Sequence, residues 1–108
     1  MLSNADYVIQ TQSGIVDGYK KNNVLFWEDI PYAQPPIKEL RWKAPRNINN
    51  PKQIILPKED NFCIQRPSNL GGPGGEGMFV GNEDCLYLDI IAPAKDKDGP
   101  FPVMFWIH

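Results

Sequence analysis

The sequence predicts an α/β fold of which this chain is the front part, and two apolar stretches carry that prediction. Residues 86–92 form a short apolar-rich run that is stopped by Pro93, as expected for a strand entering a core. Residues 102–107 contain almost no polar side chain, and continuous apolar runs are typical of central strands of an α/β sheet, which are covered on both faces. We therefore expect a larger domain that continues beyond His108 and covers this sheet.

The elements before these strands are predicted to be short. Residues 7–11 and 15–20 are expected to be two strands that are joined by a turn at residues 12–14. A second turn at residues 21–23 leads into a strand expected at residues 24–30. The opening of the chain is thus predicted to be an antiparallel meander.

The composition of the sequence changes between Pro31 and Pro57, where six prolines occur. Each proline fixes φ and removes an amide donor, which predicts irregular chain lying over another part of the fold. Tyr32, Leu40 and Trp42 are the expected anchors of this segment. With 11 prolines and 9 glycines in 108 residues, no amphipathic helix longer than about two turns is expected.

The charge balance excludes two classes of partner. The chain has 11 lysines and arginines against 13 aspartates and glutamates, which gives no global field that would attract nucleic acid or an anionic membrane surface. No apolar run approaches the ~20 residues of a membrane span, and residues 1–6 lack the basic and apolar regions of a secretory signal. If Met1 is the true start, a cytoplasmic location is expected.

Four short motifs follow one another along the chain. They are G-I-V-D-G at 14–18, I-P-Y-A-Q-P-P at 30–36 with L-R-W at 40–42, E-D-C-L-Y-L-D-I-I-A-P at 83–93, and P-V-M-F-W-I-H at 102–108. Together they resemble the type-B carboxylesterases, the α/β-hydrolase family that also contains the cholinesterases, the bile-salt-type lipases and the neuroligins. The resemblance implies that residues 1–108 are the N-terminal portion of one α/β-hydrolase domain, which is truncated at the strand that leads to the oxyanion loop.

The same resemblance implies a serine hydrolase that cleaves small-molecule carboxylic esters through an acyl-enzyme, without metal or cofactor. Such enzymes use a serine at a G-E-S-x-G elbow, a histidine with a carboxylate, and backbone amides that hold the oxyanion. None of the three triad positions lies in this chain, so the chain alone is predicted to be inactive. His108 is expected to position the oxyanion loop and not to act as a base. Ser3, Ser13 and Ser68 match no elbow and are expected to be surface residues.

Cys63 and Cys85 leave three alternatives open from the residues alone: a disulfide, part of a metal site, or two unrelated thiols. A zinc site normally needs four ligands, and His108 is the only other soft ligand in the chain. The family pairs the matching positions, so the resemblance implies a disulfide, worth about 3 kcal/mol by the loop-entropy argument. A disulfide would indicate a secreted or periplasmic protein.

Between the cysteines, residues 72–77 fit the pattern G-x-G-x-x-G. A dinucleotide site needs a strand just before this pattern and a helix just after it, and neither is expected here. In the family this loop helps to wall the entrance to the active-site gorge. The loop lacks the tryptophan with which choline-binding esterases hold a quaternary ammonium. Phe62 and Phe79 are the only aromatic residues at this rim, so choline esters are not the expected substrates.

The family also pairs an arginine and a glutamate at the positions of Arg41 and Glu83. The resemblance implies a partly buried bidentate salt bridge that ties the proline-rich segment to the mouth of the strand at 86–92. Two positions depart from the family pattern, because Asp29 and Lys38 stand where glycine is usual. Both turns are expected to differ locally.

Two functions outside catalysis stay open. A relative of the neuroligin kind would keep the fold as an interaction domain and lack the serine. A stand-alone, disulfide-stapled binding module would instead fold at this length and show a cooperative unfolding transition.

Overall fold

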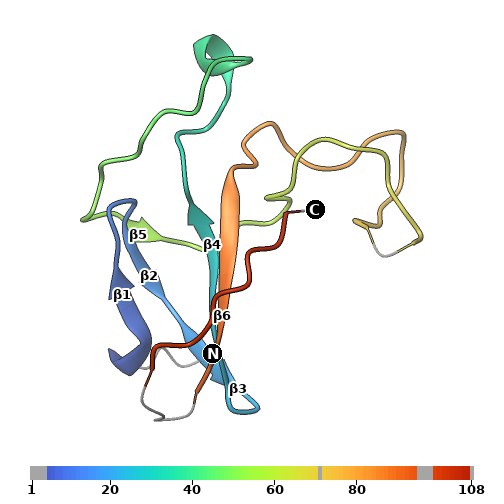
Figure 1. Ribbon diagram of the computed structural model, residues 1–108. Coiled ribbons are helices and arrows are strands. Elements are labelled where there is room, and N and C mark those ends of the chain that lie inside the picture. The colour runs from blue at the N-terminus through green and yellow to red at the C-terminus, as the bar shows by residue number, and fades with distance from the viewer. Residues whose placement is uncertain (1–4, 71, 95–98, 108) are drawn as a thin grey trace.

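Two small sheets lie next to each other, and long irregular chain surrounds them (Figure 1). The structure is a computed structural model that describes residues 5–70, 72–94 and 99–107. Within these ranges helix is limited to two 3₁₀ turns, η1 (Ala5–Tyr7) and η2 (Lys38–Leu40), in line with the short elements expected from the prolines and glycines. Among the described residues, neither of these turns is long and apolar enough to cross a membrane.

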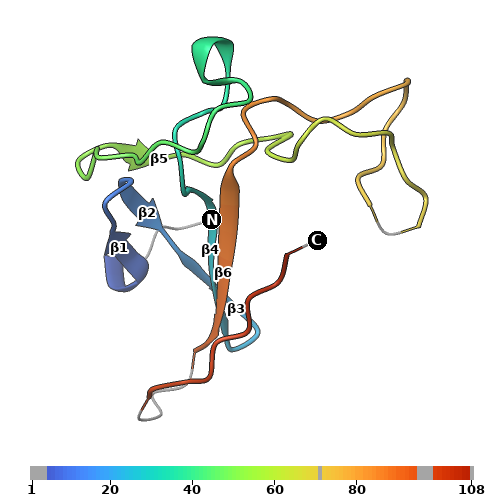
Figure 2. The same cartoon turned by 45° about the horizontal axis from the view of Figure 1, so that its top comes forward.

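The strands are paired mainly in antiparallel fashion. The first sheet has the order β1-β2-β5 and the second has the order β3-β4-β6. Their bounds are β1 (Val8–Gln10), β2 (Ile15–Asp17), β3 (Tyr19–Lys21), β4 (Val24–Pro31), β5 (Ile54–Ile55) and β6 (Tyr87–Pro93). Only the β2–β5 pair is parallel among the strands that the structure describes. The pair of β4 and β6 is the longest strand pair described, and Figure 2 shows the two strands side by side along their length.

The chain changes sheets at Gly18, which divides the single strand expected at residues 15–20. Gly18 donates its N–H to the carbonyl of Tyr7 at 3.1 Å, and Trp27 donates its indole N–H to the same carbonyl at 2.8 Å. A Cβ at Gly18 would lie 2.9 Å from the carbonyl oxygen of Phe26 and closer still to the Trp27 ring. The expected antiparallel pairs β1–β2 and β3–β4 are present, but they belong to two sheets because this close approach separates β2 from β3.

The hydrophobic core lies where β2 of the first sheet meets β4 of the second. Its buried members are Val16, Trp27 and Ile30, against which Leu25, Ile55, Leu88 and Ala92 pack. These side chains come from both sheets, so burial of apolar surface between the sheets holds them together.

The proline-rich segment is irregular as predicted, except at η2 and β5. The strand β5 was not predicted. It pairs with β2 next to a hydrogen bond from the Ile15 N–H to the Gln53 carbonyl at 2.8 Å. Three apolar residues before Pro57 give too short a run to predict a strand. The strand β2 that completes the pair is nearly forty residues away along the chain.

Two of the three expected anchors of this segment are wrong. Tyr32 is 52% exposed and Trp42 is 94% exposed, whereas Leu40 lines a shallow pocket with Leu86. The segment is held by backbone hydrogen bonds and not by buried aromatic side chains. One example is the bond from the Gln34 N–H to the Arg46 carbonyl at 2.8 Å.

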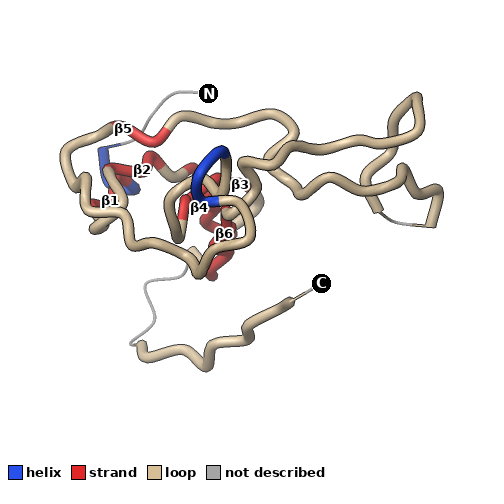
Figure 3. Tube along the Cα trace, turned by 90° about the horizontal axis from the view of Figure 1, so that it is seen from above, coloured by secondary structure: helices blue, strands red, loops and turns tan. Residues whose placement is uncertain are grey.

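The strand expected at residues 102–107 is not formed within the described part of the chain. Figure 3 shows residues 101–107 clear of both sheets, and the side chains from Val103 to Ile107 are between 76% and 91% exposed. No backbone hydrogen bond joins this segment to another described residue. A strand needs a paired neighbour for its N–H and C=O groups, so the apolar pattern does not produce one here.

Gly18→Ala is expected to destabilise the protein by about 1–3 kcal/mol, because the new Cβ must displace the Trp27 ring. Gly74→Ala is the matched control, since a Cβ at Gly74 meets nothing within 4 Å. Urea unfolding followed by tryptophan fluorescence measures both changes. Equal stability of the two variants would contradict the close approach of Gly18 and Trp27.

Candidate functional site

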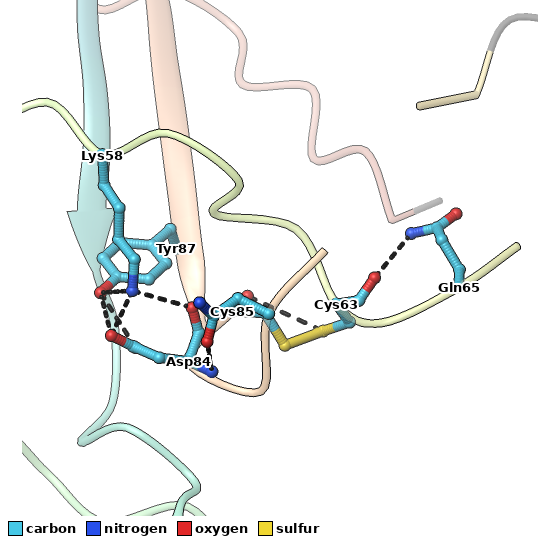
Figure 4. The surroundings of a disulfide bond; sticks show 7 residues. Lys58, Cys63, Gln65, Asp84, Cys85 and Tyr87 are labelled. Carbon is cyan, nitrogen blue, oxygen red and sulfur yellow. Dashed lines mark hydrogen bonds and ion pairs between the residues drawn. A yellow bond between two sulfur atoms is a disulfide. The ribbon is translucent and has the colours of Figure 1, made fainter. Parts of the chain in front are cut away.

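A disulfide between Cys63 and Cys85 closes a loop at the mouth of β6 (Figure 4). The two Cα atoms are 4.9 Å apart, and the cysteines are 22 residues apart in sequence. Of the three alternatives for these cysteines, the disulfide is the one that the structure contains. Because both sulfur atoms are used in this bond, neither is available as a thiolate metal ligand.

The loop between the cysteines is held mainly at its base. The backbones of Gln65 and Val80 exchange hydrogen bonds of 2.9 and 2.8 Å, and the Asn82 N–H donates to the Phe62 carbonyl at 2.9 Å. Farther out, the glycine-rich residues 72–77 are mostly exposed and contain no strand or helix. The position of the loop therefore depends on the contacts at its two ends.

Three oxygen atoms surround the ammonium group of Lys58 beside the disulfide (Figure 4). Lys58 Nζ forms a salt bridge with the Asp84 carboxylate, and it also donates to the Asp84 carbonyl at 3.1 Å and to the Tyr87 hydroxyl at 3.2 Å. The Tyr87 hydroxyl donates to the Asp84 carboxylate at 2.9 Å. Nζ lies 4.9 Å from the centre of the Tyr87 ring, within range of a cation–π contact.

This arrangement keeps its protons at neutral pH. Burial alone would lower the pKa of Lys58, but the hydrogen bonds and charges of Asp84 and Tyr87 outweigh burial and raise that pKa. Burial also raises the pKa of Tyr87, and Asp84 adds to this effect while Lys58 opposes it. Lys58 is thus an ammonium and Tyr87 a neutral phenol at neutral pH, and their hydrogen bonds to Asp84 join the two ends of the loop.

Asp29 extends these contacts to β4. The register of the β4–β6 pair shifts between Trp27 and Ile30, and Asp29, at this bulge, is buried and has a φ of 60°. Its carboxylate accepts the Lys58 backbone N–H at 2.9 Å and the Asn61 side-chain amide.

Asp29 also donates its own N–H to the Asp89 carboxylate at 2.9 Å. We call Lys58, Asp84, Tyr87, Asp29 and Asn61 the base cluster, because they surround the base of the disulfide loop.

The role of Asp29 was not predicted from the sequence, although Asp29 stands where the family usually has glycine. Asp29 and Lys38 both adopt positive φ, at 60° and 50°, which is the region that glycine favours. Aspartate tolerates this region better than most residues, and at Asp29 the side chain gains hydrogen-bond partners in exchange. A charged residue at a position where glycine is usual was the feature of the sequence that could have indicated this role.

Arg41 of the proline-rich segment forms a salt bridge with Glu83, which lies just before β6. Arg41 Nε is 2.7 Å from Glu83 Oε1, and the two side chains are 51% and 39% exposed. This pair is more exposed than a buried bridge, so water screens its charges. Its role as a structural tie stays a prediction.

The serines that were expected to be surface residues take part in local hydrogen bonds where the structure describes them. His108 and Ser3 lie outside the described residues. Ser68 uses its hydroxyl to accept the Leu70 N–H at 3.1 Å, and the Ser13 backbone N–H donates to the Thr11 hydroxyl at 3.1 Å.

The two rim aromatics differ in burial. Phe62 is half-buried at the base of the loop, while Phe79 is 57% exposed. Their contribution to a gorge rim stays a prediction.

Comparisons with known proteins agree on one family. The profile of the Carboxylesterase family matches residues 5–108. The chain is 36% identical to venom carboxylesterase-6 of Apis mellifera, with 93% of this chain and 19% of that protein covered. It is 34% identical to para-nitrobenzyl esterase of Bacillus subtilis, with 94% and 20% covered.

The fold agrees with a solved structure from the same group. A thermophilic PNB esterase matches with a TM-score of 0.63 and 32% identity, over 82% of this chain and 18% of that one. The chain therefore spans about a fifth of the length of the relatives that it matches.

The two salt bridges are expected to differ in strength. Lys58→Met should destabilise the protein by about 2 kcal/mol, because it leaves Asp84 without its charged hydrogen-bond donor. Arg41→Met should cost less than about 1 kcal/mol, because its pair is more exposed. Both variants keep an unbranched apolar stem, and urea unfolding measures the difference. If Arg41→Met lost more unfolding free energy than Lys58→Met, the Lys58–Asp84 pair would not be the stronger of the two salt bridges.

The stabilising effect of Lys58 is expected to disappear at alkaline pH. The folded state raises the pKa of Lys58 above 10.5 and that of Tyr87 above 10.0, so both groups contribute stability below their unfolded pKa values and lose it as pH rises through the folded values. The difference in unfolding free energy between the parent and Lys58→Met should be constant below about pH 9 and shrink above about pH 10. Lys20→Met, at an exposed lysine, is the control. A difference that does not change with pH would contradict the raised pKa values.

Proposed function

Since the chain belongs to the carboxylesterase family, we propose that it is the N-terminal segment of a longer serine hydrolase that cleaves small-molecule carboxylic esters. The match of residues 5–108 to the family profile is the observation that carries this proposal. The share of the relatives that the chain spans agrees with it, because four fifths of their length lies outside the match.

In the proposed reaction a serine hydroxyl from the remainder of the protein attacks the ester carbonyl. A histidine takes the serine proton, the C–O bond to the alcohol breaks, and the alcohol leaves with that proton. Water then hydrolyses the acyl-enzyme and regenerates the serine. Residues 1–108 supply none of these groups, and they contribute the sheets, the disulfide loop and the segment that leads to His108.

The exposed apolar segment at residues 101–107 supports the proposal that this chain is part of a larger domain. Met104 is 91% exposed and Trp106 is 82% exposed, and soluble proteins rarely leave consecutive large apolar side chains in water. We propose that the rest of the hydrolase domain pairs with this segment and covers it.

The disulfide supports an oxidising compartment. Disulfides persist in secreted and periplasmic proteins and are rare in the cytosol, and the Cys63–Cys85 bond closes the loop in this structure. One of the relatives is named as a venom carboxylesterase. We propose a secreted or periplasmic location for this protein.

The test is hydrolysis of p-nitrophenyl butyrate by the full-length protein. We expect turnover that a sulfonyl fluoride abolishes by modifying the serine, and no turnover by purified residues 1–108. Butyrylthiocholine should be a poorer substrate, because Phe62 and Phe79 are the rim aromatics and no tryptophan occupies the loop.

A full-length protein that neither hydrolyses esters nor reacts with the sulfonyl fluoride would overturn the proposal and support a non-catalytic interaction domain. Hydrolysis by residues 1–108 that the sulfonyl fluoride does not stop would also contradict it.

A further inference from the structure

The disulfide loop has two legs, and the base cluster touches both of them. The first leg enters through Lys58 and Asn61 and reaches Cys63, and the second returns through Asp84 to Cys85. The Lys58 side chain bonds to Asp84 across this gap, in addition to the disulfide itself. Two links, one ionic and one covalent, therefore join the legs.

The same cluster fixes the first leg to the sheet. The Lys58 N–H and the Asn61 amide both donate to Asp29 at the β4 bulge. Asp29 is buried and hydrogen-bonded to Asp89 of β6, so the leg is tied to the most regular part of the fold. The orientation of the loop relative to β4 and β6 is thus set by polar contacts at Lys58 and Asp29.

The contacts of the described outer-loop residues are mainly with one another, as in the hydrogen bond from the Ser68 N–H to the Pro73 carbonyl at 2.9 Å. Leu70 is 97% exposed and Met78 is 74% exposed, and a Cβ at Gly74 or Gly77 would meet no atom within 4 Å. With so little packing against the sheets, this segment is attached to the fold mainly through its base.

We propose that Lys58, held by Asp84 and Asp29, is a positioning residue that fixes the disulfide loop at its base. Lys58 favours the oxidised loop because it keeps the two legs at bonding distance before the sulfur atoms join. It also fixes the direction in which the loop leaves the sheet. This second consequence rests on the proposed esterase function, in which the loop borders the ester-binding gorge, whereas the first consequence does not.

The first experiment measures disulfide formation in the full-length protein in glutathione redox buffers, by alkylation and mass spectrometry. Lys58→Met should lower the equilibrium constant for the Cys63–Cys85 bond about tenfold, the effect of losing one charged hydrogen-bond donor. Lys58→Arg, which keeps the charge and the donors, should recover most of that loss. Lys20→Met is the matched control and should leave the constant unchanged.

A Lys58→Met protein with the same equilibrium constant as Lys20→Met overturns the proposal. If Lys58→Met does not fold, Tyr87→Phe replaces it, because this variant removes only one hydroxyl of the base cluster. Its matched control is Tyr19→Phe, which removes a hydroxyl that donates to Glu28 at 2.9 Å on an exposed edge. Tyr87→Phe must then lower the constant more than Tyr19→Phe does.

The second experiment compares p-nitrophenyl acetate with p-nitrophenyl decanoate as substrates of the same full-length proteins. Lys58→Met should raise KM several-fold for the long ester with little change in kcat, and leave both parameters for acetate unchanged. An equal loss for both esters, or a loss in kcat alone, overturns the positioning role at the gorge. A parent protein that hydrolyses neither ester rejects the proposed function, while the disulfide equilibrium still decides whether Lys58 fixes the loop.

Discussion

The pairing of β4 with β6 is the contact on which the rest of the structure depends. It joins segments that lie about 60 residues apart, as the Asp29–Asp89 hydrogen bond illustrates. Trp27 and Ile30 of β4 supply two of the three buried members of the core cluster. The strand β6 begins two residues after Cys85, so the same pairing also places one end of the disulfide loop against the sheet.

The bulge in this pairing explains why polar groups lie close to the core. An unpaired charge in a buried position is costly unless hydrogen bonds surround it. Asp29 accepts bonds from Lys58 and Asn61 and donates its N–H to Asp89, so its burial is compensated. The left-handed backbone at Asp29 costs on the order of 1 kcal/mol, and these bonds hold the residue in that conformation. A local irregularity in one strand thereby becomes the attachment point of a distant loop.

The apolar residues of the chain are divided between a small core and a large exposed set. Val16 and Ala33 are 3% exposed, whereas Val103 is 90% exposed. Hydrophobic burial stabilises a fold roughly in proportion to the apolar area removed from water. Many large apolar side chains of the described residues therefore stay exposed. This agrees with a chain that spans about a fifth of the length of its carboxylesterase relatives.

The sequence by itself determined the family, the irregular proline-rich segment and the positions of β4 and β6, because motif spacing, prolines and short apolar runs are local properties. From the family pattern it also indicated the Cys63–Cys85 disulfide. Only the tertiary structure decided the break at Gly18, the absence of a strand at residues 102–107 and the base cluster around Lys58. Each of these depends on residues outside the local stretch: the Trp27 ring for Gly18, a paired strand for residues 102–107, and Asp29 and Asp84 for Lys58.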